Sequence, residues 1–184
     1  MRIDSATALL DEADYIPSPN HDERPEGSEV DLLVIHNISL PPKEYGGPYI
    51  EQLFTNCLDP QAHPYFEGIC QLKVSSHLLI RRDGQIIQFV PFDKRAWHAG
   101  ESCFGERQRC NDFSIGIELE GSDDVPYEDI QYERLVAVTR SIRHAYPGIT
   151  LDHIVGHTDI APQRKTDPGP AFDWARFRQG LAMA

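Results

Sequence analysis

The sequence predicts an α/β protein in which a single mixed β-sheet is flanked by two or three helices. Short runs of β-forming residues recur along the chain, an Asp-Gly turn signal joins two of them into a hairpin, and two segments have the apolar spacing of amphipathic helices. A chain that mixes strands, a hairpin and helices in this way is expected to pack its helices on the faces of one sheet.

Residues 1 to about 29 are the least regular part of the chain. They are polar and interrupted by three prolines. We expect them to form an irregular arm packed on a single domain that spans 1–184, a length ordinary for one domain. The segment that follows, DLLVIH at 31–36, is apolar on both of its alternating faces, which is typical of a strand inside a sheet.

The middle of the chain predicts a short helix and a hairpin. Pro48 is well placed in the first turn of a helix that continues through 49–54. The segments 74–80 and 85–90 are rich in β-forming residues and are joined by Arg-Arg-Asp-Gly, so we expect them to pair. Residues 91–113 have no periodicity and form a loop long enough to indicate a functional role.

The segment SIGIELE at 114–120 alternates strictly between apolar and other residues. Because successive side chains of a strand point to opposite faces, a strand that buries these isoleucines presents Glu118 on the opposite face. Further along, apolar residues at helical spacing predict a helix over about 126–146, which a Pro-Gly pair ends. HIVGH at 153–157 is expected as a short strand, and an amphipathic helix through Trp174 and Phe177 follows.

Composition excludes several classes of partner. Seventeen basic and 29 acidic residues give a formal net charge of −12, whereas nucleic acid and anionic membranes require a cationic surface. We find no apolar run of signal-peptide or membrane-spanning length, so we expect a cytoplasmic protein. We also expect it to be a monomer. The cysteines form no C-x-x-C pair and are expected to be reduced thiols: Cys57, Cys70, Cys103 and Cys110.

Two of the eight histidines, His36 and His157, stand at the carboxyl ends of expected strands, where mixed sheets often build their sites. A lone histidine there is more often a hydrogen-bonded structural residue than a metal ligand. The loop GHTDIAPQRKTDPGP strengthens the metal hypothesis because it adds two aspartates in a segment stiffened by prolines. Either Asp159 or Asp167 could complete the set of three protein ligands that catalytic zinc usually has.

A zinc hydrolase also needs a general base and a group that stabilises the developing oxyanion. Glu118, on the polar face of its strand, suits the first role. Lys165, in the stiff loop, suits the second. Tyr65, His77 and His98 are candidates for contacts with substrate or with the outer nitrogens of the ligands.

Several long blocks of the sequence also resemble one known family. They read, in chain order, VIHNISLPP, HPYF, SSHLLIRRDGQIIQFVPFDKRAWHAG, RCNDFSIGIELEG and GHTDIAPQRKTDPGPAFDWARF. They are similar to the zinc-dependent N-acetylmuramoyl-L-alanine amidases, whose fold is shared with phage lysozyme-amidases and animal peptidoglycan-recognition proteins. The resemblance runs from about Pro17 to Phe177.

The resemblance implies that ten residues of this chain hold the metal, catalyse the reaction or bind the substrate. One zinc ion would be held by His36, His157 and Asp167, which leaves Asp159 to brace the loop. Glu118 and Lys165 match the catalytic glutamate and lysine. The positions associated with holding the muramyl-peptide are Asn37, Lys73, Trp97, Arg109 and Ala161. Lys73 stands where relatives carry Arg, so the charge is kept without the bidentate fork.

Three functional hypotheses follow from the resemblance. The first is a cytoplasmic hydrolase that cuts between 1,6-anhydro-N-acetylmuramic acid and L-alanine during peptidoglycan recycling, with an indirect influence on β-lactamase induction. The second is the same chemistry on polymeric murein. The third is a non-catalytic peptidoglycan-recognition module, which the retention of all three ligands with Glu118 and Lys165 disfavours.

Overall fold

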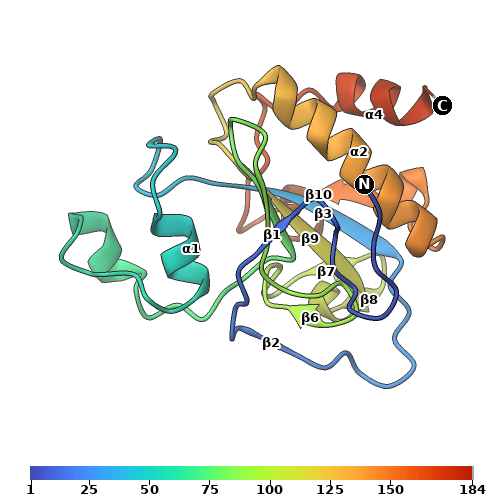
Figure 1. Cartoon of the computed structure of the whole chain (residues 1–184), viewed down its shortest axis with the longest axis horizontal. Coiled ribbons are helices and arrows are strands. Elements are labelled where there is room, and N and C mark those ends of the chain that lie inside the picture. The colour runs from blue at the N-terminus through green and yellow to red at the C-terminus, as the bar shows by residue number, and fades with distance from the viewer. Residues whose placement is uncertain (184) are drawn as a thin grey trace.

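The computed structural model describes residues 1–183 and confirms the mixed α/β architecture (Figure 1). Its strands are β1 Asp14–Tyr15, β2 His21–Asp22, β3 Leu32–Ile38, β4 Leu78–Ile80, β5 Ile86–Gln88, β6 Arg95–Ala96, β7 Cys103–Phe104, β8 Arg107–Gln108, β9 Ser114–Glu120 and β10 Ile154–Gly156. Its α-helices are α1 Tyr49–Phe54, α2 Asp129–Ala145, α3 His157–Ile160 and α4 Trp174–Ala182, and short 3-10 helices span Pro64–Gly68, Cys110–Asp112 and Leu151–His153. A six-stranded sheet in the order β1-β5-β4-β9-β3-β10 forms the centre.

The two longest strands, β3 and β9, lie side by side in the middle of this sheet. They pair in parallel, with His36 opposite Glu118, and β10 pairs in parallel on the other side of β3. The expected hairpin is present as the antiparallel pair β4 and β5. Both strands are shorter than the predicted ranges 74–80 and 85–90. At the start of the first range, the Ser75 N–H donates to the carbonyl of Trp97 in the loop 91–113 at 3.1 Å and is not paired with β5.

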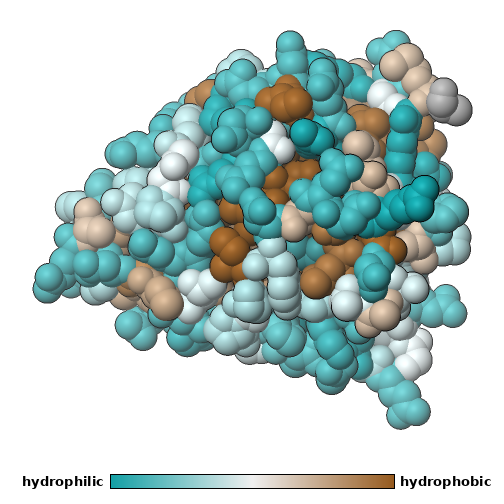
Figure 2. Space-filling view, in the orientation of Figure 1, coloured by the Kyte–Doolittle hydropathy of each residue, from teal (hydrophilic) through white to brown (hydrophobic). Residues whose placement is uncertain are grey.

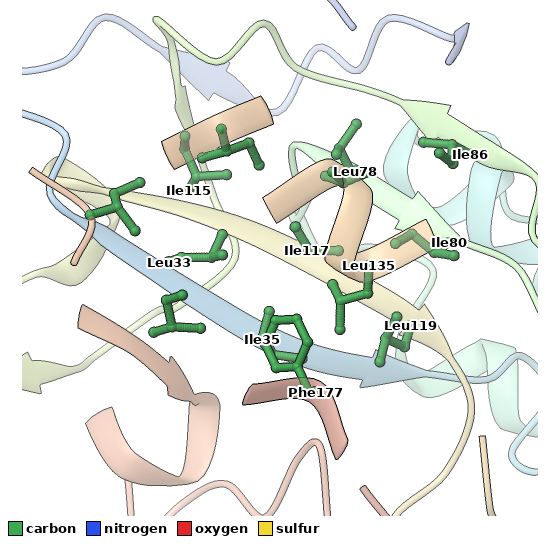
Figure 3. Packing of buried hydrophobic residues seen from close by; sticks show 14 of the residues in the cluster. Leu33, Ile35, Leu78, Ile80, Ile86, Ile115, Ile117, Leu119, Leu135 and Phe177 are labelled. Atoms are coloured by element: carbon green, nitrogen blue, oxygen red, sulfur yellow. The ribbon is translucent and has the colours of Figure 1, made fainter. Parts of the chain in front are cut away.

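One face of the sheet forms the main hydrophobic core (Figure 3). Leu33 and Ile35 of β3 lie beside Ile115, Ile117 and Leu119 of β9, all fully or almost fully buried. Leu135 of α2 and Phe177 of α4 cover them, and Figure 1 shows both helices on this side of the sheet.

The candidate site residues His36 and Glu118 lie on the opposite face of the sheet. The alternation of β9 places Glu118 there, as the sequence predicts, and the register with β3 places His36 beside it. Helix α1, drawn at the left of Figure 1, and its apolar neighbours cover part of this face. The loop 91–113 covers another part through Ala99 and Phe113.

The N-terminal residues are paired with this loop and with the sheet. β1 pairs with β5, and β2 pairs antiparallel with β6. Between β2 and β3, the guanidinium of Arg24 donates to the carbonyls of Ser114 at 2.9 Å, Asn111 at 3.1 Å and Phe92 at 3.2 Å. A single side chain thus ties this segment to the start of β9 and to both ends of the loop.

The molecular surface is mainly hydrophilic on the face in Figure 2, with small hydrophobic patches near its middle. No helix among residues 1–183 is both long and apolar enough to cross a bilayer. All four cysteines are free thiols, as expected.

His77 gives the fold a measurable dependence on pH. Its Nδ1 accepts from the Gly116 N–H at 3.0 Å, so its Nε2 carries the proton and donates to the Lys94 carbonyl at 3.0 Å. Burial, with the charge of Arg24, lowers the pKa of His77 to about 3. As the pH falls below about 6.5, this histidine binds a proton in the unfolded chain but not in the folded one. The free energy of unfolding therefore decreases towards pH 3.

The variant His77→Gln should therefore lose part of this dependence. In metal-free protein, the slope of the unfolding free energy against pH between pH 4 and 6 should be shallower than wild type by up to about 1.4 kcal/mol per pH unit. Denaturant titrations at several pH values measure it. Above pH 7.5 the two slopes should coincide. Equal slopes between pH 4 and 6 would contradict a neutral buried His77.

Candidate active site

Three donor atoms meet at the carboxyl ends of β3 and β10. His36 lies near the end of β3, His157 is the first residue of α3 directly after β10, and Asp167 lies in the loop beyond α3. The His36 Nδ1 is 3.0 Å from the His157 Nδ1 and 3.1 Å from the Asp167 Oδ2, which is 3.0 Å from the His157 Nδ1. The parallel pairing of β3 with β10 brings the two histidines together although they are far apart in sequence.

The outer nitrogens of the two histidines have partners of their own. The His157 Nε2 lies 3.1 Å from the Ala99 carbonyl, and the His36 Nε2 lies 2.9 Å from the His98 Nδ1. A carbonyl only accepts, so we assign the proton of neutral His157 to Nε2, and its Nδ1 then presents a lone pair. With this assignment, the lone pair of the His157 Nδ1 faces the Asp167 carboxylate.

The charge state of the trio favours a bound cation. Burial lowers the pKa of His36 to about 4, which keeps the imidazole neutral at pH 7. Burial opposes ionisation of Asp167, but hydrogen bonds from His157 and His36 outweigh that effect and hold its pKa well below the ordinary range when those rings carry a proton on Nδ1. A bound cation would take the place of that proton. Acceptor atoms about 3 Å apart repel one another unless a cation lies between them. Two imidazole nitrogens and a carboxylate oxygen are a donor set that divalent zinc accepts, so the residues present fit such a metal.

Glu118 lies beside this trio, on the neighbouring strand β9. Its side chain is 8% exposed, and its Oε2 is buried with no hydrogen-bond partner among the described residues. Burial raises its pKa well above the ordinary value, the charge of Asp167 adds to the rise, and Lys165 counteracts it. A buried carboxyl with free acceptor capacity and a raised pKa is suited to exchange protons with a reactant near neutral pH.

Lys165 is half-buried in the wall of the same cleft and forms no ion pair within the part of the chain that the structure describes. Its backbone N–H donates to the Ala161 carbonyl at 2.9 Å, which fixes the loop that carries it. An unpaired ammonium group facing a cleft can interact with negative charge on a ligand.

The cleft has a volume of about 370 Å³ and two contrasting sides. The polar side includes the five residues already described, and it is completed by Asn37, Ser39, Ser75 and His98. The apolar side comes from α1 and the segments around it: Leu40, Leu53, Phe54, Ile69, Leu72 and Val74. Tyr65 and Trp97 also line the cleft. This volume suits a small polar ligand with apolar parts.

The expected substrate contacts divide into two groups. Asn37 and Trp97 line the cleft, and Lys73 is exposed outside its lining. Arg109, 69% exposed and paired with Asp112, lines a separate pocket of about 480 Å³ together with Ala161. The structure therefore gathers two of the five around the trio.

Two of the expected contacts are already engaged within the chain. The amide of Asn37 donates to Asp123 at 2.8 Å and to the Pro168 carbonyl at 3.1 Å. The Trp97 indole donates to Asp22 at 3.1 Å. These bonds fix the orientation of both side chains at the edge of the cleft.

Asp159 lies apart from the three converging donors. Its Oδ2 accepts from the Gly156 N–H at 2.7 Å, so it braces the turn from β10 into α3. Sequence reasoning from the residues alone left the choice between Asp159 and Asp167 open. It also did not predict that Ala99 contacts His157. This contact is made by a backbone carbonyl, which every residue has, so the identity of the residue gives no indication of it.

Comparison with known proteins identifies the class to which this fold and site belong. Residues 26–170 match the family model described as N-acetylmuramoyl-L-alanine amidase. The chain belongs to this family, and it is an amide hydrolase.

Within that family, the chain is similar to enzymes named for an anhydro sugar. It is 63% identical over 175 residues to the 1,6-anhydro-N-acetylmuramyl-L-alanine amidase AmpD of Enterobacter cloacae, covering 95% of this chain and 93% of that protein. A crystal structure of an AmpD selenomethionine derivative superposes with a TM-score of 0.95 at 59% identity, covering 98% of this chain and 99% of that one. The Escherichia coli amidase AmiD, in complex with the substrate anhydro-N-acetylmuramic acid-L-Ala-D-γ-Glu-L-Lys, gives a TM-score of 0.60 at 32% identity, with coverage of 86% and 60%.

Proposed function

We propose that the chain is a zinc-dependent amidase that cleaves the bond between 1,6-anhydro-N-acetylmuramic acid and L-alanine in muropeptides. The observation that carries this proposal is the convergence of His36, His157 and Asp167 within about 3 Å of one another beside the unpaired carboxyl of Glu118. Family membership and the names of the relatives support the choice of bond.

The metal would be held by His36, His157 and Asp167. When bound, Zn²⁺ supplies a Lewis acid that polarises the scissile carbonyl and makes water more acidic. The neutral state of His36 favours binding, because metal ligands must be deprotonated.

Glu118 is proposed to move the proton of the reaction. It takes a proton from the water that attacks the carbonyl carbon and later gives it to the departing alanine nitrogen. Its burial beside Asp167 raises its pKa, which makes it a stronger base than an exposed glutamate, and Lys165 moderates this effect. Both transfers use a carboxyl group that has no competing hydrogen bond at Oε2.

Lys165 is proposed to stabilise the negative charge that develops on the carbonyl oxygen. The variant Lys165→Met keeps a long side chain without the charge, and it should lower kcat by about 10²–10³-fold. Steady-state kinetics on an anhydro-muropeptide measures the effect, and zinc content should stay at the wild-type level. A variant with wild-type kcat would remove Lys165 from the mechanism.

The proposed substrate is a soluble muropeptide and not polymeric murein. The small volume of the cleft, about 370 Å³, and the similarity to relatives named for the anhydro sugar support this choice. We expect release of peptide from an anhydro-muropeptide at a rate at least about tenfold above that from intact sacculi, because a polymer must leave most of its length outside the cleft. Chromatography of both digests tests it, and equal rates would favour the murein-degrading alternative.

Four further parts of the proposal rest on the sequence and on the family resemblance, and not on the geometry of the site. They are cytoplasmic peptidoglycan recycling, an indirect influence on β-lactamase induction, a monomeric state, and a single amidase domain over 1–184. Fractionation of cells tests the location, and a β-lactamase reporter in a deletion strain tests the influence on induction. Sedimentation tests the monomeric state, and limited proteolysis tests the single domain.

A further inference from the structure

Behind the two candidate histidine ligands lies a short stretch of the loop 91–113. His98 and Ala99 are consecutive, and each contacts the outer nitrogen of a different ligand. The His98 Nδ1 lies 2.9 Å from the His36 Nε2, and the Ala99 carbonyl lies 3.1 Å from the His157 Nε2. One dipeptide thus meets both imidazoles on the side away from Asp167.

A buried amide holds this dipeptide in place. The Oδ1 of Asn111 accepts from the Ala99 N–H at 2.8 Å and from the His98 N–H at 3.2 Å. Asn111 is 7% exposed and lies in the 3-10 helix directly before β9. The side chain therefore links the position of the dipeptide to the sheet that carries Glu118.

A missing side chain on β9 provides the space for His98. A Cβ atom added at Gly116 would lie 2.5 Å from both Cγ and Nδ1 of the His98 ring, closer than real Cβ contacts. On the far side of the ring, the His98 Nε2 lies 3.1 Å from the Ser114 Oγ. Gly116 precedes Glu118 by two residues on the same face, so one strand forms the slot for the ring and presents the proposed base.

We infer that His98 and Asn111 are positioning residues that orient the Nδ1 atoms of His36 and His157 towards the metal. The inference rests on the proposed function, since it requires that the trio binds zinc. The hydrogen-bond chain is self-consistent: with its proton on Nε2, His36 donates to the His98 Nδ1, and the His98 Nε2–H donates to Ser114. Outer partners that fix the tautomer and ring orientation of a ligand typically change metal affinity by about 10–100-fold.

The test measures zinc affinity and stability separately. Zinc Kd is obtained by competition with a chromophoric chelator, starting from metal-free protein, and unfolding of the metal-free protein is followed by circular dichroism. The variants His98→Phe and Asn111→Leu remove the contacts and keep comparable volume. Asn111→Asp keeps an oxygen that can accept both N–H groups. Val138→Ala, in the core on α2, is the matched control for lost stability.

We expect His98→Phe and Asn111→Leu to raise the zinc Kd by about 10–100-fold, Asn111→Asp to remain near wild type, and Val138→Ala to lower stability without changing Kd. If His98→Phe fails to fold, ¹⁵N spectra of the zinc-loaded wild-type protein decide the point. They should place the His98 proton on Nε2 and leave Nδ1 of His36 and His157 without a proton.

Two results would overturn the inference, and they are distinguishable. The positioning role would be excluded if the wild type binds zinc tightly and the zinc Kd is unchanged in His98→Phe and Asn111→Leu. A His98 proton on Nδ1 would exclude it as well. Either result would leave the proposed function standing. A wild-type protein that binds no zinc would overturn the proposed function and the inference together.

Discussion

The variant Glu118→Gln is expected to lower hydrolysis by about 10²–10⁴-fold and to keep the zinc content of the wild-type protein. Glutamine has nearly the size of glutamate but cannot accept and return a proton. Glu118 lies outside the trio of donor atoms, so its replacement leaves all three intact. Turnover of an anhydro-muropeptide and metal analysis of the same sample measure both quantities.

The same substitution should make the metal-free protein more stable at pH 7. Because burial raises the pKa of Glu118 in the folded state, keeping this group ionised there costs free energy that a neutral amide avoids. This cost in folding free energy is fully present above the folded-state pKa of Glu118. It disappears as the pH falls to the ordinary pKa of glutamate, because the carboxyl group is then protonated in both the folded and the unfolded state. The stability gain of Glu118→Gln should therefore vanish at low pH.

Glu23→Gln is the matched control, since it makes the same chemical change on a side chain that is 80% exposed. It should leave turnover unchanged. Wild-type turnover in Glu118→Gln would exclude Glu118 as the base. Loss of zinc in that variant would instead assign it to the metal site.

The variant Asp167→Ala is expected to lose both zinc and activity. It removes one of three donors and leaves the lone pairs of His36 and His157 about 3.0 Å apart without the carboxylate. The loss of zinc affinity should exceed the roughly 10–100-fold that is typical of changes to outer partners. Chelator competition and turnover measure it.

Asp159→Ala is the control for Asp167→Ala. Asp159 lies eight residues earlier in the same loop and accepts a hydrogen bond from the Gly156 N–H. Its loss should lower stability by about 1 kcal/mol, as for other side-chain caps, and should leave zinc bound. Zinc loss of equal size in both variants would show that the loop responds to any change and would contradict a specific role for Asp167.

The parts of the fold that could be predicted depend on local periodicity. The alternation of SIGIELE fixed which residues of β9 enter the core and placed Glu118 opposite them, because a strand has a period of two. The strands that carry His36 and precede His157 were also visible in the sequence, although β10 is shorter than the predicted 153–157 because His153 ends a 3-10 helix and His157 begins α3. That the two imidazoles meet depends on the pairing of β10 with β3, which no local pattern encodes.

Other parts of the site could be predicted only from family resemblance, or not at all. The sequence alone did not separate Asp167 from Asp159, since both are acidic residues in one stiff loop. His98 was one of three candidates for contact with an outer ligand nitrogen. That it contacts His36 depends on the space above Gly116, which a single glycine in a strand does not predict. The proposed roles of Lys73 and Arg109 stay predictions, because both side chains are exposed outside the cleft lining.

Mass analysis of the products formed from anhydro-N-acetylmuramic acid-L-Ala-D-γ-Glu-L-Lys tests the central claim most directly. The purified protein should release free 1,6-anhydro-N-acetylmuramic acid and a peptide that begins with L-alanine. A chelator should stop the reaction, and added Zn²⁺ should restore it. Cleavage at another bond, or full activity in protein shown to be free of metal, would contradict a zinc-dependent muramyl-alanine amidase.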